Sequence, residues 1–152
     1  MSKPSDVVGR IHSEILPMKV GFTGTQMGMT HSQCTAFMEL MNEIMPVEFH
    51  HGDCIGADSM AAKMVLANFP ECIVICHPPE CASKQAFVGG HVVLPAKPYL
   101  ERNHDIVDAC DVLLACPKSK IEELRSGTWA TVRYAISIGK PVRIVLPDGR
   151  VI

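Results

Sequence analysis

Short apolar blocks alternate along this chain with longer segments in which apolar residues recur every three or four positions. Such blocks are typical of buried strands, and the periodic segments are typical of helices packed on one side. Five blocks predict strands, at 18–25, 47–51, 72–76, 112–115 and 141–147. Helices are predicted from a Thr30 or Ser32 cap to residue 45, and at 57–69, 98–111 and 127–138. This alternation predicts an α/β fold, a single Rossmann-like domain with a five-stranded, mainly parallel sheet and helices on both faces.

The same periodicity predicts which side chains of two helices face inward. The inward set of the first helix after the cap is Cys34, Phe37, Met38, Met41 and Ile44 or Met45. The inward set of the 98–111 helix is Leu100, Ile106, Val107 and Ala109.

Two segments stand apart from the alternation. Residues 1–17 predict an N-terminal helical arm, with a helix at 6–16 that Pro17 stops, packed on the body or on a second subunit. The domain itself is expected to span 18–152. Residues 77–98 are rich in Pro and Gly and too irregular to predict a helix or strand. Loops of this length usually bind ligands or cover a site.

Small and polar residues gather where the predicted strands end. They are Thr23, Gly24 and Thr25 after the first strand, Gly52 to Asp58 after the second, His77 after the third, and Ser126 to Thr128 after the fourth. The carboxyl ends of parallel strands meet at one edge of a sheet, where open α/β sheets bind their ligands. We therefore expect these residues to converge.

The turn Ser126-Gly127-Thr128 opens the last predicted helix and is the strongest candidate for an anion site. The first amide N–H groups of a helix have no partner and carry partial positive charge. Gly127 would let a ligand approach the backbone, the hydroxyls of Ser126 and Thr128 could contact a phosphate, and Arg125 could add a charged contact. The alternative is that Ser126 is only a helix cap and Gly127 only a turn residue.

Two further groups allow a functional and a structural interpretation. Gly52, Asp53, Gly56, Ala57 and Asp58 fall where a ligand is expected, although Asp58 would also stabilise a first helical turn by itself. Arg102 and Asn103 either point back into the cleft or lie on a solvated helix face. The adjacent His50 and His51 must face opposite sides of their strand, so at most one can reach the cleft.

Composition narrows the class of protein. The chain has 152 residues, 47% of them hydrophobic, with 14 basic and 16 acidic residues and a net charge of −2. This favours a cytoplasmic protein with a small-molecule partner over one that binds nucleic acid or an anionic membrane. No signal peptide, membrane span, cofactor or metal is expected. The seven cysteines form no CxxC pair and suggest reduced thiols. A zinc site from Cys72, Cys76, Cys81 and His77 is the alternative, although its spacing matches no common zinc pattern.

Five motifs taken in order resemble the SLOG superfamily over roughly 18–146. They are Phe22-Thr23-Gly24-Thr25, His51-Gly52-Asp53 with Gly56-Ala57-Asp58, Arg102-Asn103, Asp111 with its strand, and Arg125-Ser126-Gly127-Thr128-Trp129. Within that group the chain looks like the small stand-alone members related to the nucleotide-binding YspA/YpsA-like proteins and to the Rossmann-like core of DprA, and it is more distantly similar to LOG phosphoribohydrolases. The resemblance implies a nucleotide or nucleotide-derived ligand, phosphate at the Ser126 turn, and a homodimer or higher homo-oligomer.

The chain departs from the LOG hydrolases at the residue that matters for catalysis. Their PGGxGTxxE motif ends in a glutamate, and alignment on Gly127-Thr128 places Thr131 there. A nucleotide N-glycosidase would then need Asp53, Asp58 or Glu101 as its catalytic carboxylate. We therefore expect a nucleotide-binding or sensing domain first, an N-glycosidase second, and a single-stranded DNA binder third. The GxGxxG and GxxxxGK[ST] fingerprints are both missing from this sequence.

Overall fold

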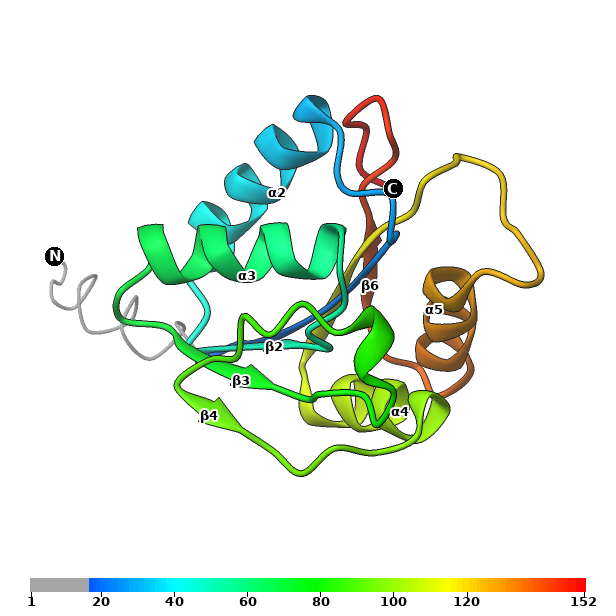
Figure 1. Ribbon diagram of the computed structural model, residues 1–152. Helices are drawn as coiled ribbons and strands as arrows, with labels where there is room; N and C mark the ends of the chain where they lie inside the picture. Colours follow the sequence, from blue (N-terminus) through cyan, green and yellow to red (C-terminus); the bar gives the residue numbers. More distant parts are fainter. Residues whose placement is uncertain (1–16) are drawn as a thin grey trace, which may run out of the picture.

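The computed structural model describes residues 17–152, which fold around a six-stranded sheet in which every neighbouring pair of strands is parallel (Figure 1). The strand order is β4-β3-β2-β1-β5-β6. The strands are β1 (Lys19–Gly24), β2 (Glu48–His51), β3 (Ile73–Cys76), β4 (Val92–Val93), β5 (Val112–Cys116) and β6 (Val142–Ile144). The helix expected at 6–16 lies outside the described residues.

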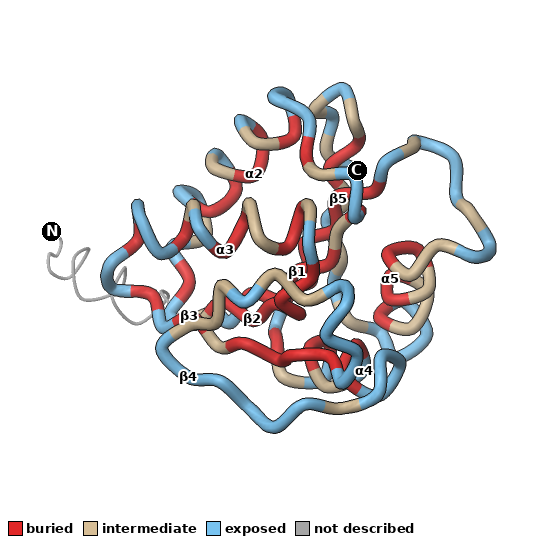
Figure 2. Tube along the Cα trace, in the orientation of Figure 1, coloured by how far each residue is buried: buried red, intermediate tan, exposed pale blue. Residues whose placement is uncertain are grey.

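Four α-helices of the described chain cover the sheet on its two faces. They are α2 (His31–Ile44), α3 (Ala57–Asn68), α4 (Tyr99–Ala109) and α5 (Gly127–Ser137). The side chains of β5 alternate between two cores, because successive residues of a strand point to opposite faces. Leu114 packs with α2 and α3, whereas Leu113 packs with α4 and α5. Figure 2 shows the buried residues concentrated along the central strands and the inner sides of these helices.

The prediction of an α/β fold with a parallel sheet is confirmed, but the prediction of five strands is wrong. The sixth strand, β4, lies inside the 77–98 segment, which also contains the 3-10 helix η1 (Ala82–Lys84). It has only two residues, and it pairs in parallel with Ile75 and Cys76. Two residues cannot show a strand periodicity, so no pattern in the sequence marks this strand.

In helix α2 a polar residue is buried where the sequence predicts only apolar ones. Thr30 is the N-cap, and with Gln33 it forms a capping box. Gln33 is buried, and its side-chain amide donates to the carbonyls of Pro117 at 2.8 Å and Val145 at 2.9 Å. These bonds attach the start of α2 to the ends of β5 and β6. The inward set therefore includes Gln33, while Cys34 is only partly buried.

Helix α4 buries Ile106 and Val107 as predicted, but it turns Leu100 outward and buries two polar residues instead. Arg102, Asn103, Ile106 and Val107 are buried, whereas Leu100, expected inside, is 64% exposed. The cause is the hydrogen bonding of Arg102 described below, which fixes the rotation of the helix. Across 17–152, every helix is too short or too polar to span a lipid bilayer.

Candidate functional site

A cleft of about 350 Å³ opens at the carboxyl ends of β1 and β5. Strand β1 is hydrogen-bonded to β2 on one side and to β5 on the other, so the chain changes direction between β1 and β5. Such a switch point leaves a crevice, because the connections leave toward opposite faces of the sheet. One wall of the cleft is the turn after β1, residues 24–27, and the opposite wall is the start of α5.

The start of α5 presents unpaired amide groups to this cleft. Ser126 caps the helix, because its hydroxyl accepts a bond from the Trp129 amide at 3.2 Å. Within residues 17–152, the N–H groups of Gly127 and Thr128 have no backbone or side-chain acceptor. Ser126 is thus a cap, as the structural interpretation held, and the helix still offers free N–H donors in a cleft.

Two cationic side chains and one carboxylate line the same cleft. Arg125 and Lys118 both belong to the loop that connects β5 with α5, and Arg125 is exposed. The Lys118 ammonium lies 3.9 Å from the Glu123 carboxylate, and both side chains are solvated. Loop residues 118 and 123 were not expected in the site, because no periodicity or motif distinguishes them from an ordinary charged loop.

Tyr99 also lines the cleft and explains the glycine at the helix start. A Cβ atom added at Gly127 would lie 2.0 Å from the Tyr99 hydroxyl oxygen. The opposite side of Tyr99 stacks near the Arg102 guanidinium, 5.0 Å from the ring centre. A side chain at position 127 would therefore displace the end of the Tyr99 side chain, so Gly127 leaves room for the Tyr99 hydroxyl.

On the opposite wall, the turn after β1 is closed by its own hydrogen bonds. The Thr25 hydroxyl accepts from the Met27 amide at 3.0 Å, and the Thr25 carbonyl accepts from Ala57 at 2.9 Å. Gly24 leaves room for α3, since an added Cβ would lie 2.5 Å from the Ala57 side chain. Thr23 is buried, and Gly24 and Thr25 line the cleft.

The Gly52–Asp58 segment runs from the end of β2 into α3 and is internally bonded. The Asp58 carboxylate accepts from the amides of Gly52 at 3.1 Å and Cys54 at 3.4 Å. Burial raises the pKa of this carboxyl to about 6, against the opposing effect of the nearby Arg102 charge. Gly56 has a φ of 94° and meets the carbonyl of Gln26 so closely that a side chain has no space. None of the residues 52, 53, 56, 57 and 58 lines the cleft.

Arg102 holds this segment in place from α4. Its guanidinium donates to the carbonyls of Gly52 and His77, the latter at 3.1 Å, and to the Asn103 side chain at 2.8 Å. Arg102 is 2% exposed, so these bonds replace its lost hydration. Arg102 and Asn103 are therefore neither a solvated helix face nor part of the cleft lining.

Asp53 organises the loop that follows β3. One carboxylate oxygen accepts from the amide of Val88 at 2.9 Å, and the other accepts from the Gln85 side chain at 3.2 Å. Asp53 also has a φ of 55° and is 1% exposed. It is thus a buried anchor for residues 85–89.

The side chains that lie close enough together to bind a metal ion are not the four of the possible zinc site. Within the described residues, the metal-compatible group is His51, Asp53 and Cys76, with ligand atoms within 4.8 Å of one another. The two nitrogens of His51 already bond to the Asp53 amide and the Gly89 carbonyl. With Asp53 bonded as above, the group serves to anchor the loop. Cys81, by contrast, is exposed.

The remaining catalytic candidate, Glu101, and Thr131, which replaces the LOG glutamate, both lie away from the cleft. Glu101 is exposed in the first turn of α4 and does not line the cleft. Thr131 is buried, and its hydroxyl donates to the Gly127 carbonyl at 2.9 Å. The carboxylate that does line the cleft is Glu123.

Comparison with models of known protein families gives no match, and comparison with curated proteins gives none either.

Proposed function

We propose that the cleft between β1 and β5 binds a nucleotide or a nucleotide-derived ligand, with its phosphate at the start of α5. The observation that carries this proposal is the cleft itself, in which the free amides of Gly127 and Thr128 lie beside Arg125 and Lys118. Helix amides and flexible cations are the groups that proteins use to bind phosphate.

The topology supports the same ligand class. The order β3-β2-β1-β5-β6 has the single reversal of a Rossmann-like sheet, and the cleft lies at that reversal. The resemblance of the ordered motifs to the SLOG superfamily points to the same kind of ligand. The volume, about 350 Å³, suits a molecule the size of one nucleotide better than an extended dinucleotide.

Binding is favoured over N-glycosidic cleavage by where the carboxylates lie. Asp53 and Asp58 are buried in hydrogen bonds, and Glu101 lies outside the cleft. A catalytic carboxylate must reach the bond on which it acts. Glu123 lines the cleft, but it lies in a solvated loop beside Lys118, where water and a cation weaken its effect on a developing charge.

Calorimetric titration of the full chain with nucleoside monophosphates, diphosphates and ADP-ribose tests the proposal. We expect saturable binding of at least one, and weaker binding of the matching nucleoside without phosphate. Arg125→Ala and Lys118→Ala should each lower the affinity roughly 5- to 30-fold, because each removes a charged hydrogen bond of about 1 to 2 kcal/mol.

Lys120→Ala is the matched control. Lys120 belongs to the same loop, is exposed, and does not line the cleft. This variant should bind like the wild type. Equal losses in all three variants would indicate only a general charge effect, and unchanged affinity in Arg125→Ala and Lys118→Ala would place the phosphate elsewhere.

A further inference from the structure

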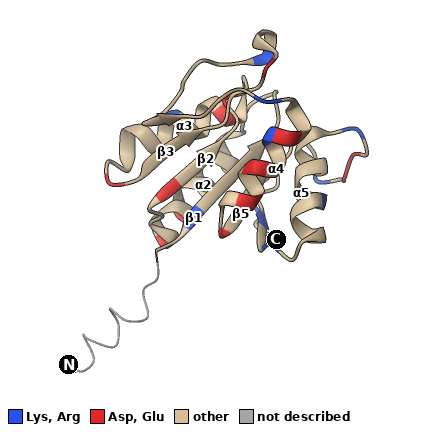
Figure 3. Ribbon diagram, turned by 90° about the horizontal axis from the view of Figure 1, so that it is seen from below, with Lys and Arg blue, Asp and Glu red and all other residues tan. Residues whose placement is uncertain are grey.

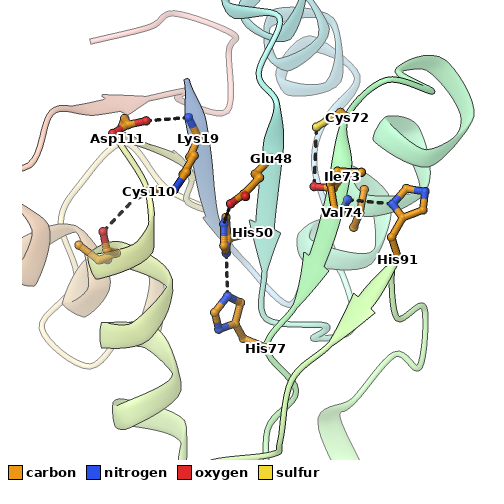
Figure 4. A network of polar contacts seen from close by, with 11 residues as sticks. Lys19, Glu48, His50, Cys72, Ile73, Val74, His77, His91, Cys110 and Asp111 are labelled. Carbon is orange, nitrogen blue, oxygen red and sulfur yellow. Dashed lines mark hydrogen bonds and ion pairs between the residues drawn. The ribbon is translucent and has the colours of Figure 1, made fainter. Parts of the chain in front are cut away.

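A chain of three side chains runs along the face of the sheet away from α2 and α3. The Glu48 carboxylate lies 2.8 Å from His50 Nε2, and His50 Nδ1 lies 2.8 Å from His77 Nε2. Figure 4 shows His77 reaching from the end of β3 toward His50 on β2. His50 and His77 are 4% and 5% exposed, so the contact between them is shielded from water, whereas the Glu48 side chain is 30% exposed.

The carboxylate at one end fixes where the hydrogens of this chain lie. An ionised carboxylate can only accept, so His50 Nε2 must carry the hydrogen in that bond. A neutral His50 then has a bare Nδ1, which accepts the hydrogen of His77 Nε2. In this arrangement, with His50 neutral, His77 keeps a lone pair on Nδ1.

His77 is part of the wall of a pocket separate from the cleft. The pocket has a volume of about 280 Å³ and is lined by His77, Leu94, Pro95, Lys97, Arg102 and Asp105. Within residues 17–152, His77 Nδ1 has no hydrogen-bond partner, and Trp129 Nε1 is the single side-chain N or O atom both fully buried and unpartnered. His77 Nδ1 is therefore not fully enclosed, and His77 lines this pocket.

The charges around the pocket balance one another. Lys97 and Asp105 form an ion pair of 2.7 Å, and Arg102 lies close to the ionisable Asp58. Burial and the neighbouring His50 lower the pKa of His77 to about 4, while Asp105 opposes this and His51 and Arg102 reinforce it. At neutral pH His77 is therefore an uncharged acceptor in a pocket with no excess charge.

We propose that this pocket is a second small-molecule site, which takes an uncharged molecule whose hydroxyl group donates a hydrogen bond to His77 Nδ1. Leu94 and Pro95 provide an apolar wall for the rest of the molecule. Glu48 and His50 are positioning residues, since they keep the His77 acceptor nitrogen free of hydrogen. This site is independent of the nucleotide cleft and does not rest on the function proposed for it.

Imidazole nitrogen NMR on the full chain at pH 7 tests the hydrogen positions directly. Two-bond correlations distinguish a protonated from a bare ring nitrogen, and His77→Gln identifies the His77 signals among the seven histidines. We expect His77 to carry its hydrogen on Nε2. A hydrogen on Nδ1 would overturn the proposal.

Glu48→Gln tests the positioning role. A glutamine amide can donate as well as accept, so both tautomers of the chain become possible and His77 Nδ1–H should appear. Glu71→Gln removes the same charge from an exposed position and should leave the tautomer unchanged. If Glu48→Gln also leaves the tautomer unchanged, Glu48 does not determine the tautomer of His77, and the positioning role proposed for Glu48 and His50 is wrong.

Phenol and fluorobenzene serve as matched probes of the pocket, being similar in size while phenol alone has a hydroxyl donor. Titration with phenol should shift the His77 Nδ1 signal saturably, and fluorobenzene should shift it at least fivefold less at equal concentration. In Glu48→Gln the phenol response should weaken. Equal responses to both probes, or no response to phenol, would exclude a hydroxyl-accepting site.

Discussion

At the scale of single residues, the main feature is a set of buried charged side chains that do not line the cleft. Arg102 is 2% and Asp58 5% exposed, and both bond to the backbone of the segment after β2. The sequence marked both as site candidates. It could not show that they bond to the backbone and stay out of the cleft lining, because a motif identifies residue types but not the direction in which a side chain points.

The pKa of Asp58 leads to a prediction about stability and pH. Folding raises this pKa from 3.8 to about 6, so the folded chain holds the proton more tightly than the unfolded chain. This stabilising contribution is complete below about pH 4 and is lost as the pH rises through about 6. In urea unfolding, the free energy of the wild type should fall relative to Asp58→Asn between pH 4 and 7, by on the order of 2 kcal/mol.

Asp148→Asn provides a control of opposite sign. Asp148 is exposed, and its pKa is lowered by its bonds to Arg150, so its contribution is lost as the pH falls. As the pH rises, the free energy of unfolding of the wild type should increase slightly relative to that of Asp148→Asn. If the free energy of unfolding of the wild type instead rises relative to that of Asp58→Asn between pH 4 and 7, the Arg102 charge outweighs burial. The direction given for the pKa shift of Asp58 would then be wrong.

At the scale of elements, long periodic segments were predictable and short or polar features were not. The first strand and the helix at 57–69 correspond closely to β1 and α3, because apolar periodicity is clear in them. The two-residue β4 carries no pattern, and its place depends on Asp53 holding residues 85–89. The exposure of Leu100 follows from the bonds of Arg102, which are contacts between distant parts of the chain.

The contact between the start of α3 and the turn after β1 leads to a prediction at this scale. A Cβ at Gly56 would meet the backbone carbonyl oxygen of Gln26 at 2.4 Å, and φ there is 94°. Gly56→Ala should therefore lower the free energy of unfolding by at least about 2 kcal/mol, from backbone strain together with the displaced turn. Chemical denaturation measures the loss.

A substitution at Gly139 separates backbone strain from the displacement of the turn. Its φ is 78°, but an added Cβ would meet no atom within 4 Å. Gly139→Ala should therefore show strain alone, a loss of about 1 kcal/mol. If Gly56→Ala loses no more unfolding free energy than Gly139→Ala, the turn after β1 moves without an energetic penalty. That turn would then not hold the cleft wall in place.

At the scale of the whole molecule, basic and acidic residues are interspersed. Figure 3 shows no gathering of Lys and Arg on the face it presents. Several cations are paired with carboxylates, including Arg133 with Glu122 at 2.6 Å and Lys118 with Glu123 at 3.9 Å. The net charge of −2 follows from the composition alone, whereas this pairing depends on the fold.

This charge distribution predicts weak binding of single-stranded DNA. Affinity for a polynucleotide scales with the number of phosphates that free cations neutralise. Grooves that bind single-stranded DNA also need aromatic side chains on which the bases stack, and aromatic residues form only 5% of this chain. In fluorescence polarisation with oligo-dT at about 150 mM salt, we expect no saturation at micromolar protein. The double variant Glu122→Gln, Glu123→Gln frees Arg133 and Lys118 and should bind more tightly at low salt, with a steeper salt dependence. Sub-micromolar binding by the wild type at about 150 mM salt would instead show that a few well-placed groups, such as the start of α5, outweigh the overall charge.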